Sequence, residues 1–152
     1  MGLTNAEVRR FLHGIKEQDE ELYHKMMQIA ELRTAVENCT SKLDKDGSQT
    51  TKGGDKLSNL MCKILDLEKE CEKLHISVNS TKKSVLELAK DLTQDRHREY
   101  LTLRFIEYNG FYDTAMKMGV SDSTARRIDR RVVSDLTKAM NKNKTNRNLP
   151  TK

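Results

Sequence analysis

The fold is decided by residues 57–92, which read LSNLMCKILDLEKECEKLHISVNSTKKSVLELAKDL. Small or apolar residues recur there at a strict seven-residue interval, at Leu57, Ile64, Cys71, Val78, Val85 and Leu92. A companion row follows the same interval at Leu60, Leu67, Leu74, Thr81 and Leu88. Two parallel rows with a period of seven are typical of a helix that packs along a left-handed supercoiled seam.

A matching row stands earlier in the chain, at Val8, Ile15, Leu22, Ile29, Val36 and Leu43. Each row spans roughly 54 Å of helix. The segment between them, residues 44–56, is polar and contains three glycines, which favours a flexible loop. Two equal helices and one loop predict an all-α, antiparallel coiled-coil hairpin over residues 4–92. Residues whose numbers add up to about 100 should then lie level with each other.

Two capping signals support these helix starts. Thr4 and Glu7 form a capping box, with Leu3 and Val8 as the accompanying hydrophobic staple. Asp55, directly after two glycines, is a candidate N-cap for the second helix.

A hairpin of two helices is thin, and some apolar positions flank its seam. We expect incomplete cover at Leu12, Met26, Met61 and Leu65. A second copy of the chain or a partner protein would cover them, and a homodimer that forms a four-helix bundle is the simpler expectation. The sequence leaves open whether the hairpin closes within one chain or between two.

Composition narrows the functional class. Hydrophobic residues make up 36% of the 152 residues and charged residues 34%, with no Trp, which disfavours a thick layered core. We find no apolar run long enough for a membrane span and no signal core at the start, so we expect a cytoplasmic protein. Cys39 and Cys71 lie in the seam and Cys62 outside it, without zinc-site spacing. Since no phosphate-binding loop or nucleophile motif is present, we expect no enzyme, cofactor or metal.

Charge is divided unevenly along the chain. Residues 1–92 carry 15 Lys and Arg against 16 Asp and Glu, whereas residues 93–152 carry 13 against 7. The whole basic excess therefore lies in the last 60 residues. Such asymmetry indicates a nucleic-acid-binding end, and a merely solubilising basic end is the alternative.

The last 60 residues predict a helix-turn-helix domain over residues 94–140. Asn109-Gly110 ends a first helix, a short helix follows over 111–118, and a further helix runs from Asp122 to Met140, capped by Ser121. Ala115 is small enough for close helix contact, and Gly119 lies at a turn that favours positive φ. The tail, residues 141–152, is basic and poor in apolar residues, so we expect it to be disordered without DNA.

The stretches Arg98–Gly110, Asp113–Ala115 and Gly119–Ile128 resemble region four of bacterial sigma factors. With the helical hairpin added, the chain resembles late-gene transcription activators of the RinA and ArpU type, from Gram-positive phages and prophages. The resemblance implies that the helix from Asp122 enters the major groove of double-stranded DNA, and that base-reading residues match Asp122, Ser123, Arg126 and Arg127. Arginine suits this role because it bridges guanine O6 and N7. Two positions depart from the family: Asp122 replaces a common Arg, and Thr114 replaces an aliphatic residue, which suggests looser packing.

Further basic residues are candidates for phosphate contact, with solvated surface as the alternative: Arg96, Arg98, Arg104, Lys117, Arg130 and Arg131. The predicted function is sequence-specific transcription regulation, with activation of phage late genes as the narrower expectation, in the cytoplasm and nucleoid of a bacterial host. RNA polymerase is an expected second partner. The alternative is an interaction protein that docks on RNA polymerase or another host protein and does not bind DNA.

Overall fold

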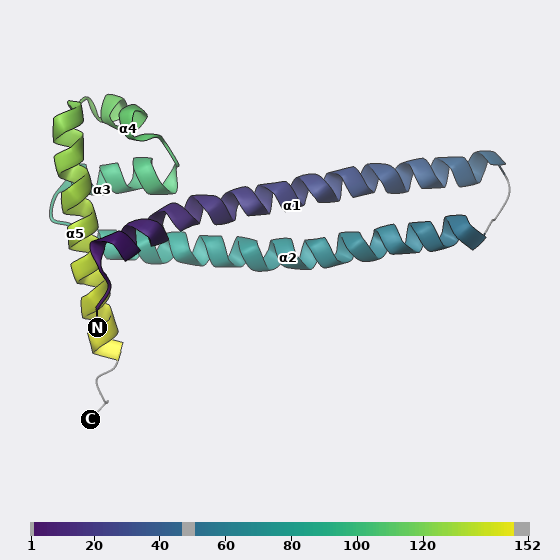
Figure 1. The fold of residues 1–152 in the computed structure, drawn as a ribbon, viewed down its shortest axis with the longest axis horizontal. Helices are drawn as coiled ribbons and strands as arrows, with labels where there is room; N and C mark the ends of the chain where they lie inside the picture. Colours follow the sequence, from purple (N-terminus) through teal and green to yellow (C-terminus); the bar gives the residue numbers. More distant parts are fainter. Residues whose placement is uncertain (1, 47–50, 148–152) are drawn as a thin grey trace. The chain divides into compact units, whose positions relative to one another are not determined.

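The computed structural model describes the backbone of residues 2–46 and 51–147 and the side chains of residues 2–41 and 54–144. The described chain is all-helical and contains no strand, which confirms the predicted all-α class. Its elements, shown in Figure 1, are α1 (Asn5–Asp46), α2 (Thr51–Ala89), α3 (Asp95–Leu101), the π-helical turn η1 (Thr102–Ile106), α4 (Phe111–Met118) and α5 (Asp122–Arg147).

The chain divides into two compact units. Unit 1 combines Met1–Glu17 with Asn79–Lys152, and unit 2 is Gln18–Val78. The predicted boundary between residues 92 and 94 therefore does not separate them. Both long helices contribute to unit 1, because their ends supply the apolar side chains that cover the C-terminal helices.

Unit 1 contains one hydrophobic core built from four of its helical elements and η1. Its buried members are Val8, Leu12, Ile15, Val85, Ala89, Leu92, Tyr100, Leu101, Phe105, Ile128, Val132, Val133 and Leu136. Burial of this much apolar surface is the main favourable term in the stability of such a unit. Leu12 is only 1% exposed, so the prediction that it is poorly covered was wrong. Side chains from the C-terminal helices, distant in sequence, provide its cover.

The start of α1 has the predicted capping box. The Thr4 amide donates to Glu7 Oε2 at 2.8 Å, and the Glu7 amide donates to Thr4 Oγ1 at 3.3 Å. The Thr4 hydroxyl also donates to Glu7 Oε2, at 3.1 Å, and the two hydrogen bonds that Glu7 Oε2 accepts lower the pKa of its carboxyl. Leu3, the proposed staple residue, packs against the core of unit 1.

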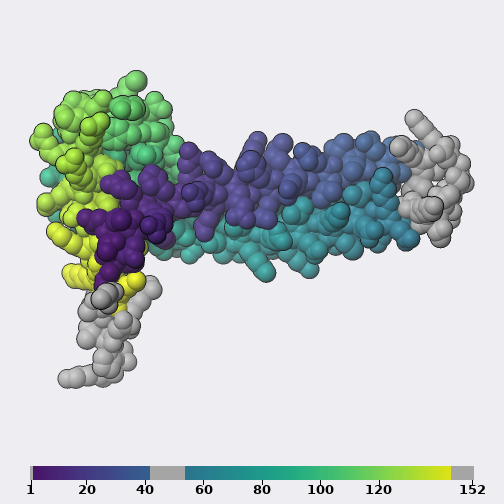
Figure 2. Space-filling view, in the orientation of Figure 1, coloured from purple at the N-terminus to yellow at the C-terminus, as the bar shows by residue number. Residues whose placement is uncertain are grey.

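Unit 2 contains the part of α1 from Gln18 onward and the part of α2 up to Val78, and these two helical segments lie side by side (Figures 1 and 2). Leu22, Ile29, Ile64 and Val78 are its buried apolar residues. Two ion pairs link the helices: Lys25 Nζ lies 2.8 Å from Glu70 Oε2, and Arg33 Nη2 lies 2.5 Å from Glu68 Oε1. The numbers in each pair add up to about 100, as predicted. Because the four side chains are partly exposed, each pair contributes little to stability.

Apolar side chains remain exposed on unit 2. Met26, Met61 and Leu65 are 57%, 45% and 52% exposed, as the sequence predicts for the flanks of a two-helix seam. Tyr23 and Ile76 are each 61% exposed.

The connection between the long helices is shorter than the predicted loop at 44–56. Helix α1 continues to Asp46 and α2 begins at Thr51, while residues 47–50 lie outside the described part of the chain. Asp55 is therefore inside α2 and is not its N-cap. A glycine inside a helix lowers the stability of that helix by about 1 kcal/mol relative to alanine. In a long helix such as α2, backbone hydrogen bonds and packing offset this loss.

Helix α5 is longer than predicted. It continues past Met140 to Arg147, so residues 141–147 of the expected tail are helical, and residues 148–152 lie outside the described chain. Tertiary contacts account for the extension. Met140 packs against the core of unit 1, and the Asn141 amide group binds the backbone of Leu3: Leu3 N donates to Oδ1 at 2.7 Å, and Nδ2 donates to Leu3 O at 3.1 Å.

The helix that ends at η1 stops at Ile106, just before the predicted stop at Asn109-Gly110. Tyr108 adopts positive φ (61°) there. Asn109 closes this end with both its backbone and its side chain, since its amide N and Nδ2 donate to Leu103 O at 3.0 and 2.9 Å. Asn109 can close the end because a short amide side chain reaches nearby backbone carbonyls.

The turn between α4 and α5 agrees with the prediction. Helix α4 covers residues 111–118 as expected, and Gly119 ends it in the left-handed region (φ 67°, ψ 33°). Nothing lies within 4 Å of the position a Cβ would take at Gly119 or at Gly14 of α1. The two glycines therefore differ in backbone conformation and not in crowding.

We expect Gly119→Ala to lower the free energy of unfolding by about 1 kcal/mol, because alanine is disfavoured at positive φ. Gly14→Ala, in the interior of α1, should raise it by about 0.5–1 kcal/mol. Urea unfolding followed by circular dichroism measures both. Equal effects of the two variants would contradict the assigned turn.

Candidate nucleic-acid interface

Helix α5 has two chemically different faces at its start. Its inner face carries the buried residues Ala125, Ile128, Val132, Val133 and Leu136. Its outer face carries exposed polar and charged side chains, and we define this outer face as Asp122, Ser123, Arg126, Arg127, Arg130 and Arg131. This separation follows from the helical period of 3.6 residues. All four predicted base-reading residues therefore lie on one accessible surface.

The first turn of α5 is fixed by Ser121, its predicted N-cap. The Thr124 amide donates to Ser121 Oγ at 3.3 Å, and Ser121 Oγ donates to Thr124 Oγ1 at 2.9 Å. Ser123 Oγ lies 3.4 Å from Ser121 Oγ, so the Ser123 and Ser121 hydroxyls are also within hydrogen-bond distance of each other. The cap satisfies one of the free amides at the helix start, so the outer face begins at a defined position.

Helix α4 holds the start of α5 through small buried side chains. Ala115 is 1% exposed, and Val120 N donates to Ala115 O at 3.1 Å across the turn. Thr114 is completely buried, and its hydroxyl donates to Gly110 O at 2.8 Å. The hydroxyl is thus fully accommodated, so its presence does not require the looser packing that we expected.

A network around Asp129 fixes the rotation of α5 in unit 1. Tyr100 Oη of α3 donates to Asp129 Oδ1 at 2.7 Å. Arg9 of α1 forms a two-point ion pair with the same carboxylate, with Nη2 2.6 Å from Oδ2 and Nη1 3.2 Å from Oδ1. Since Arg127 and Arg130 adjoin Asp129 in sequence, this network sets where the outer face points relative to its own unit.

Burial and charge change the titration of the groups in this network. Burial, with the hydrogen bond to Asp129, raises the pKa of the Tyr100 hydroxyl far above its ordinary value. The hydrogen bond to Asp129 raises the pKa of the Arg9 guanidinium. Tyr100 therefore remains a neutral donor and Arg9 a permanent cation.

Burial also lowers the pKa of His13 and of His97, so these imidazoles favour the neutral form.

The sequence singled out neither Arg9 nor Asp129. A usable signal was present, because Asp129 interrupts the otherwise apolar inner face between Ile128 and Val132. An acid at such a position requires a partner. One of its two partners, Arg9, is 120 residues away in sequence, so no local pattern could have identified it.

The predicted basic residues differ in how they are engaged. Arg126, Arg127 and Arg130 are exposed and form no ion pair with any described residue, whereas Arg131 Nε lies 3.3 Å from Asp135 Oδ2. Three arginines of the outer face therefore have their guanidinium groups available for a ligand.

The other predicted phosphate-contacting residues lie elsewhere in unit 1. Arg96 is exposed, and Arg98 pairs with Asp95 at 2.8 Å. Arg104 Nη1 donates to Asn109 O at 3.0 Å, and Lys117 Nζ donates to Asn109 Oδ1 at 2.8 Å. The structure thus brings Arg104 and Lys117 together at Asn109, a grouping that the sequence did not indicate.

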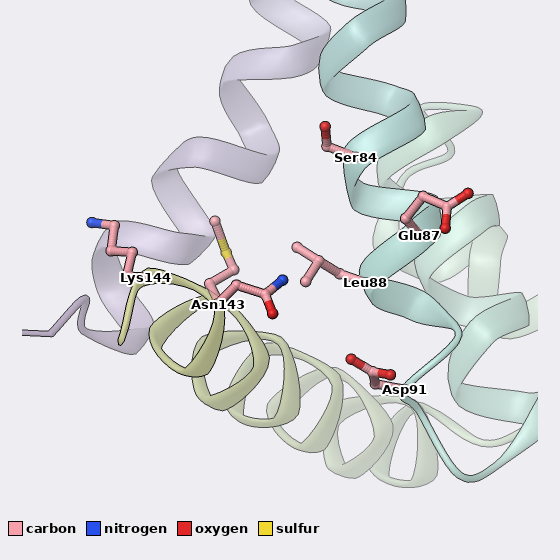
Figure 3. A pocket seen from close by; sticks show the side chains of 7 residues that line it. Ser84, Glu87, Leu88, Asp91, Asn143 and Lys144 are labelled. Carbon is pink, nitrogen blue, oxygen red and sulfur yellow. The ribbon is translucent and has the colours of Figure 1, made fainter. Parts of the chain in front are cut away.

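A pocket in unit 1 lies between the end of α2 and the end of α5 (Figure 3). It is lined by Ser84, Glu87, Leu88, Asp91, Met140, Asn143 and Lys144. Leu88 and Asn143 point toward each other in it. Two carboxylates against one ammonium group make this pocket a poor match for a phosphate backbone, so we place the candidate interface on the outer face of α5.

The described residues of the chain contain no group of three or more His, Cys, Asp and Glu that could hold a metal ion. Cys62 is exposed, while Cys39 and Cys71 are half-buried in unit 2. None of the described helices combines the length and apolarity that crossing a membrane requires.

Comparisons of the chain with protein-family models, with curated proteins and with solved structures found no match.

We expect Asp129→Ala to lower the free energy of unfolding by about 2 kcal/mol, because it leaves the buried Tyr100 hydroxyl without its charged acceptor. Tyr100→Phe should cost about 1 kcal/mol, since Arg9 retains its partner. Asp113→Ala, at an exposed site on α4, serves as the control and should change stability by less than about 0.5 kcal/mol. Thermal and urea unfolding measure these free energies. If Asp129→Ala lowered the free energy of unfolding no more than Asp113→Ala does, the role of Asp129 would be refuted.

Proposed function

We propose that the protein is a sequence-specific DNA-binding transcription regulator in which α4 and α5 act as a helix-turn-helix like that of sigma region four. The observation that carries this proposal is the outer face of α5. It offers Arg126, Arg127 and Arg130 unpaired and exposed beside a capped helix start. Guanidinium groups on an accessible helix match the acceptors of guanine and of phosphate in the major groove.

The resemblance of residues 98–128 to sigma region four supports the narrower proposal of a late-gene activator of the Gram-positive phage type. In that role, α5 binds the promoter and a second surface contacts RNA polymerase. Base contacts are assigned to Asp122, Ser123, Arg126 and Arg127. Arg130 and Arg131, one turn further along α5, are assigned to phosphate.

We further propose that unit 2 is a coiled-coil hairpin through which two chains form a homodimer. The exposed side chains of Met26, Met61 and Leu65 support this assignment, because a second hairpin would remove them from water. A dimer carries two DNA-binding units, so the second contact forms at a high effective concentration and overall affinity rises.

A second candidate function is docking on a protein without DNA binding. It is favoured by the exposed side chains of Tyr112 and Met116 on α4, which are 63% and 77% exposed. Such side chains are enriched in protein interfaces. RNA polymerase is the partner we assign to this alternative.

We expect Arg126→Ala with Arg127→Ala to abolish sequence preference and leave the fold intact. Selection of bound fragments from a random DNA pool at near-physiological salt measures the preference, and circular dichroism monitors the fold. Lys63→Ala with Lys69→Ala removes two exposed positive charges from unit 2 and is the charge-matched control. A motif that survives unchanged in the arginine variant would sink the assignment of α5 as the recognition helix.

Salt dependence separates the two candidate functions. A DNA-binding protein with six to ten phosphate contacts should lose about 10³- to 10⁵-fold in affinity between 50 and 200 mM salt. A docking protein has no such requirement. Binding to a DNA duplex that is insensitive to salt, or absent, would favour docking.

We expect Met61→Lys with Leu65→Lys to convert a dimer into a monomer without loss of helicity, because four buried lysines would face one another across two chains. Sedimentation equilibrium gives the mass, and circular dichroism gives the helicity. Asn59→Lys with Cys62→Lys, at exposed positions on the same turns of α2, is the control. A monomeric wild-type protein refutes the homodimer. A dimeric mass in both variants refutes the assignment of Met61 and Leu65 to the dimer contact.

A further inference from the structure

Asp122 gives the outer face of α5 a chemically distinct end. It is the only acid among the six residues of that face, and it is the first residue of α5. Its side chain is exposed and forms no hydrogen bond or ion pair with any described residue. Arg126 lies four residues further along, on the same side of the helix. A carboxylate and a guanidinium group are therefore presented side by side.

The structure does not require Asp122 to cap α5. Ser121 already supplies the N-cap, since its Oγ accepts from the Thr124 amide at 3.3 Å. An acid in the first turn interacts favourably with the helix dipole, but that contribution is small at an exposed site. This leaves the carboxylate oxygens available to a ligand, even though a negative charge opposes DNA binding in general. The unfavourable charge is expected to be compensated by a specific contact.

Base edges in the major groove differ in what they offer to a carboxylate. Cytosine presents the N4 amino group, which is a donor. Guanine presents only the acceptors N7 and O6, and thymine presents the acceptor O4 and a methyl group. Adenine presents a donor directly beside the acceptor N7, which repels a second carboxylate oxygen. An ionised aspartate can only accept hydrogen bonds, so cytosine is the base it fits best.

We propose that Asp122 is a specificity residue that selects cytosine, and that this cytosine lies within about two base pairs of a guanine read by Arg126. The spacing follows from geometry: four residues advance a helix by about 6 Å, and successive bases are about 3.4 Å apart. This inference rests on the proposed DNA-binding function. It also predicts that guanine is disfavoured at the base pair that Asp122 contacts. The carboxylate oxygens would there be repelled by the acceptors O6 and N7.

The test is selection of bound fragments from a random DNA pool with the full-length chain and three variants. Asp122→Asn keeps the size of the side chain, removes its charge and adds a donor. Asp122→Ala removes the contact. Asp113→Asn removes one charge from the exposed first turn of α4 and is the matched control. Competition with duplexes that differ at the single cytosine then gives relative affinities.

The expected wild-type motif contains a cytosine within two positions of a guanine. The preference for cytosine over guanine should be on the order of tenfold, and Asp122→Ala should lose it while retaining the guanine. Asp122→Asn should shift the preference to adenine, because an amide pairs with both N6 and N7. Asp113→Asn should keep the wild-type motif. A role of Asp122 in helix stability alone would leave every column of the motif unchanged.

Two results would overturn the inference and are distinguishable from each other. A wild-type motif that Asp122→Ala leaves intact refutes the role of Asp122, while the proposed function stands. The absence of any motif for the wild-type protein refutes sequence-specific binding itself, and the role of Asp122 with it.

Discussion

The Asp129 carboxylate holds together three helices of unit 1. It accepts from Tyr100 Oη at 2.7 Å and pairs with Arg9 at two points, which joins α5 to α3 and α1. Around this polar contact the core excludes water, since Tyr100 and Val132 are completely buried. A partly buried carboxylate is tolerated there because both of its oxygens have donors. The direction of the outer face of α5 depends on this contact.

One sequence pattern serves two different environments. The row of apolar residues at seven-residue intervals in α1 continues without a break from Val8 through Ile29. Val8 and Ile15 pack in the core of unit 1, whereas Leu22 and Ile29 are buried in the seam of unit 2. A heptad row specifies which side of a helix is buried, but it does not specify the partner. The long helices therefore belong to both units, and unit 1 requires their ends as part of its core.

The arginines on the outer face of α5 are available for a ligand because nearby acidic side chains are directed elsewhere. Asp129, the nearest acid in sequence to Arg127 and Arg130, is directed inward by Tyr100 and Arg9. The arginines beside it remain unpaired among the described residues, apart from the link between Arg131 and Asp135. Arg104 and Lys117 instead donate to Asn109, a neutral residue, so their charges are also uncompensated by those bonds. The neutral acceptor Asn109 and the inward-facing Asp129 thus leave these basic side chains without an acidic partner among the described residues.

Local features of this protein were determined by the sequence alone. The capping box at Thr4, the cap at Ser121, the bounds of α4 and the positive φ of Gly119 depend on hydrogen bonds and dihedral angles within a few residues. The exposure of Asp122, Ser123, Arg126 and Arg127 follows equally from helical periodicity. Tertiary structure alone decided the burial of Leu12, the extension of α5 to Arg147, the partners of Asp129 and the meeting of Arg104 and Lys117 at Asn109. Those features depend on packing and hydrogen bonds between residues that only the fold brings together. Arg9 and Asp129 come from opposite ends of the chain, and no periodic pattern in the sequence indicates that two such distant residues meet.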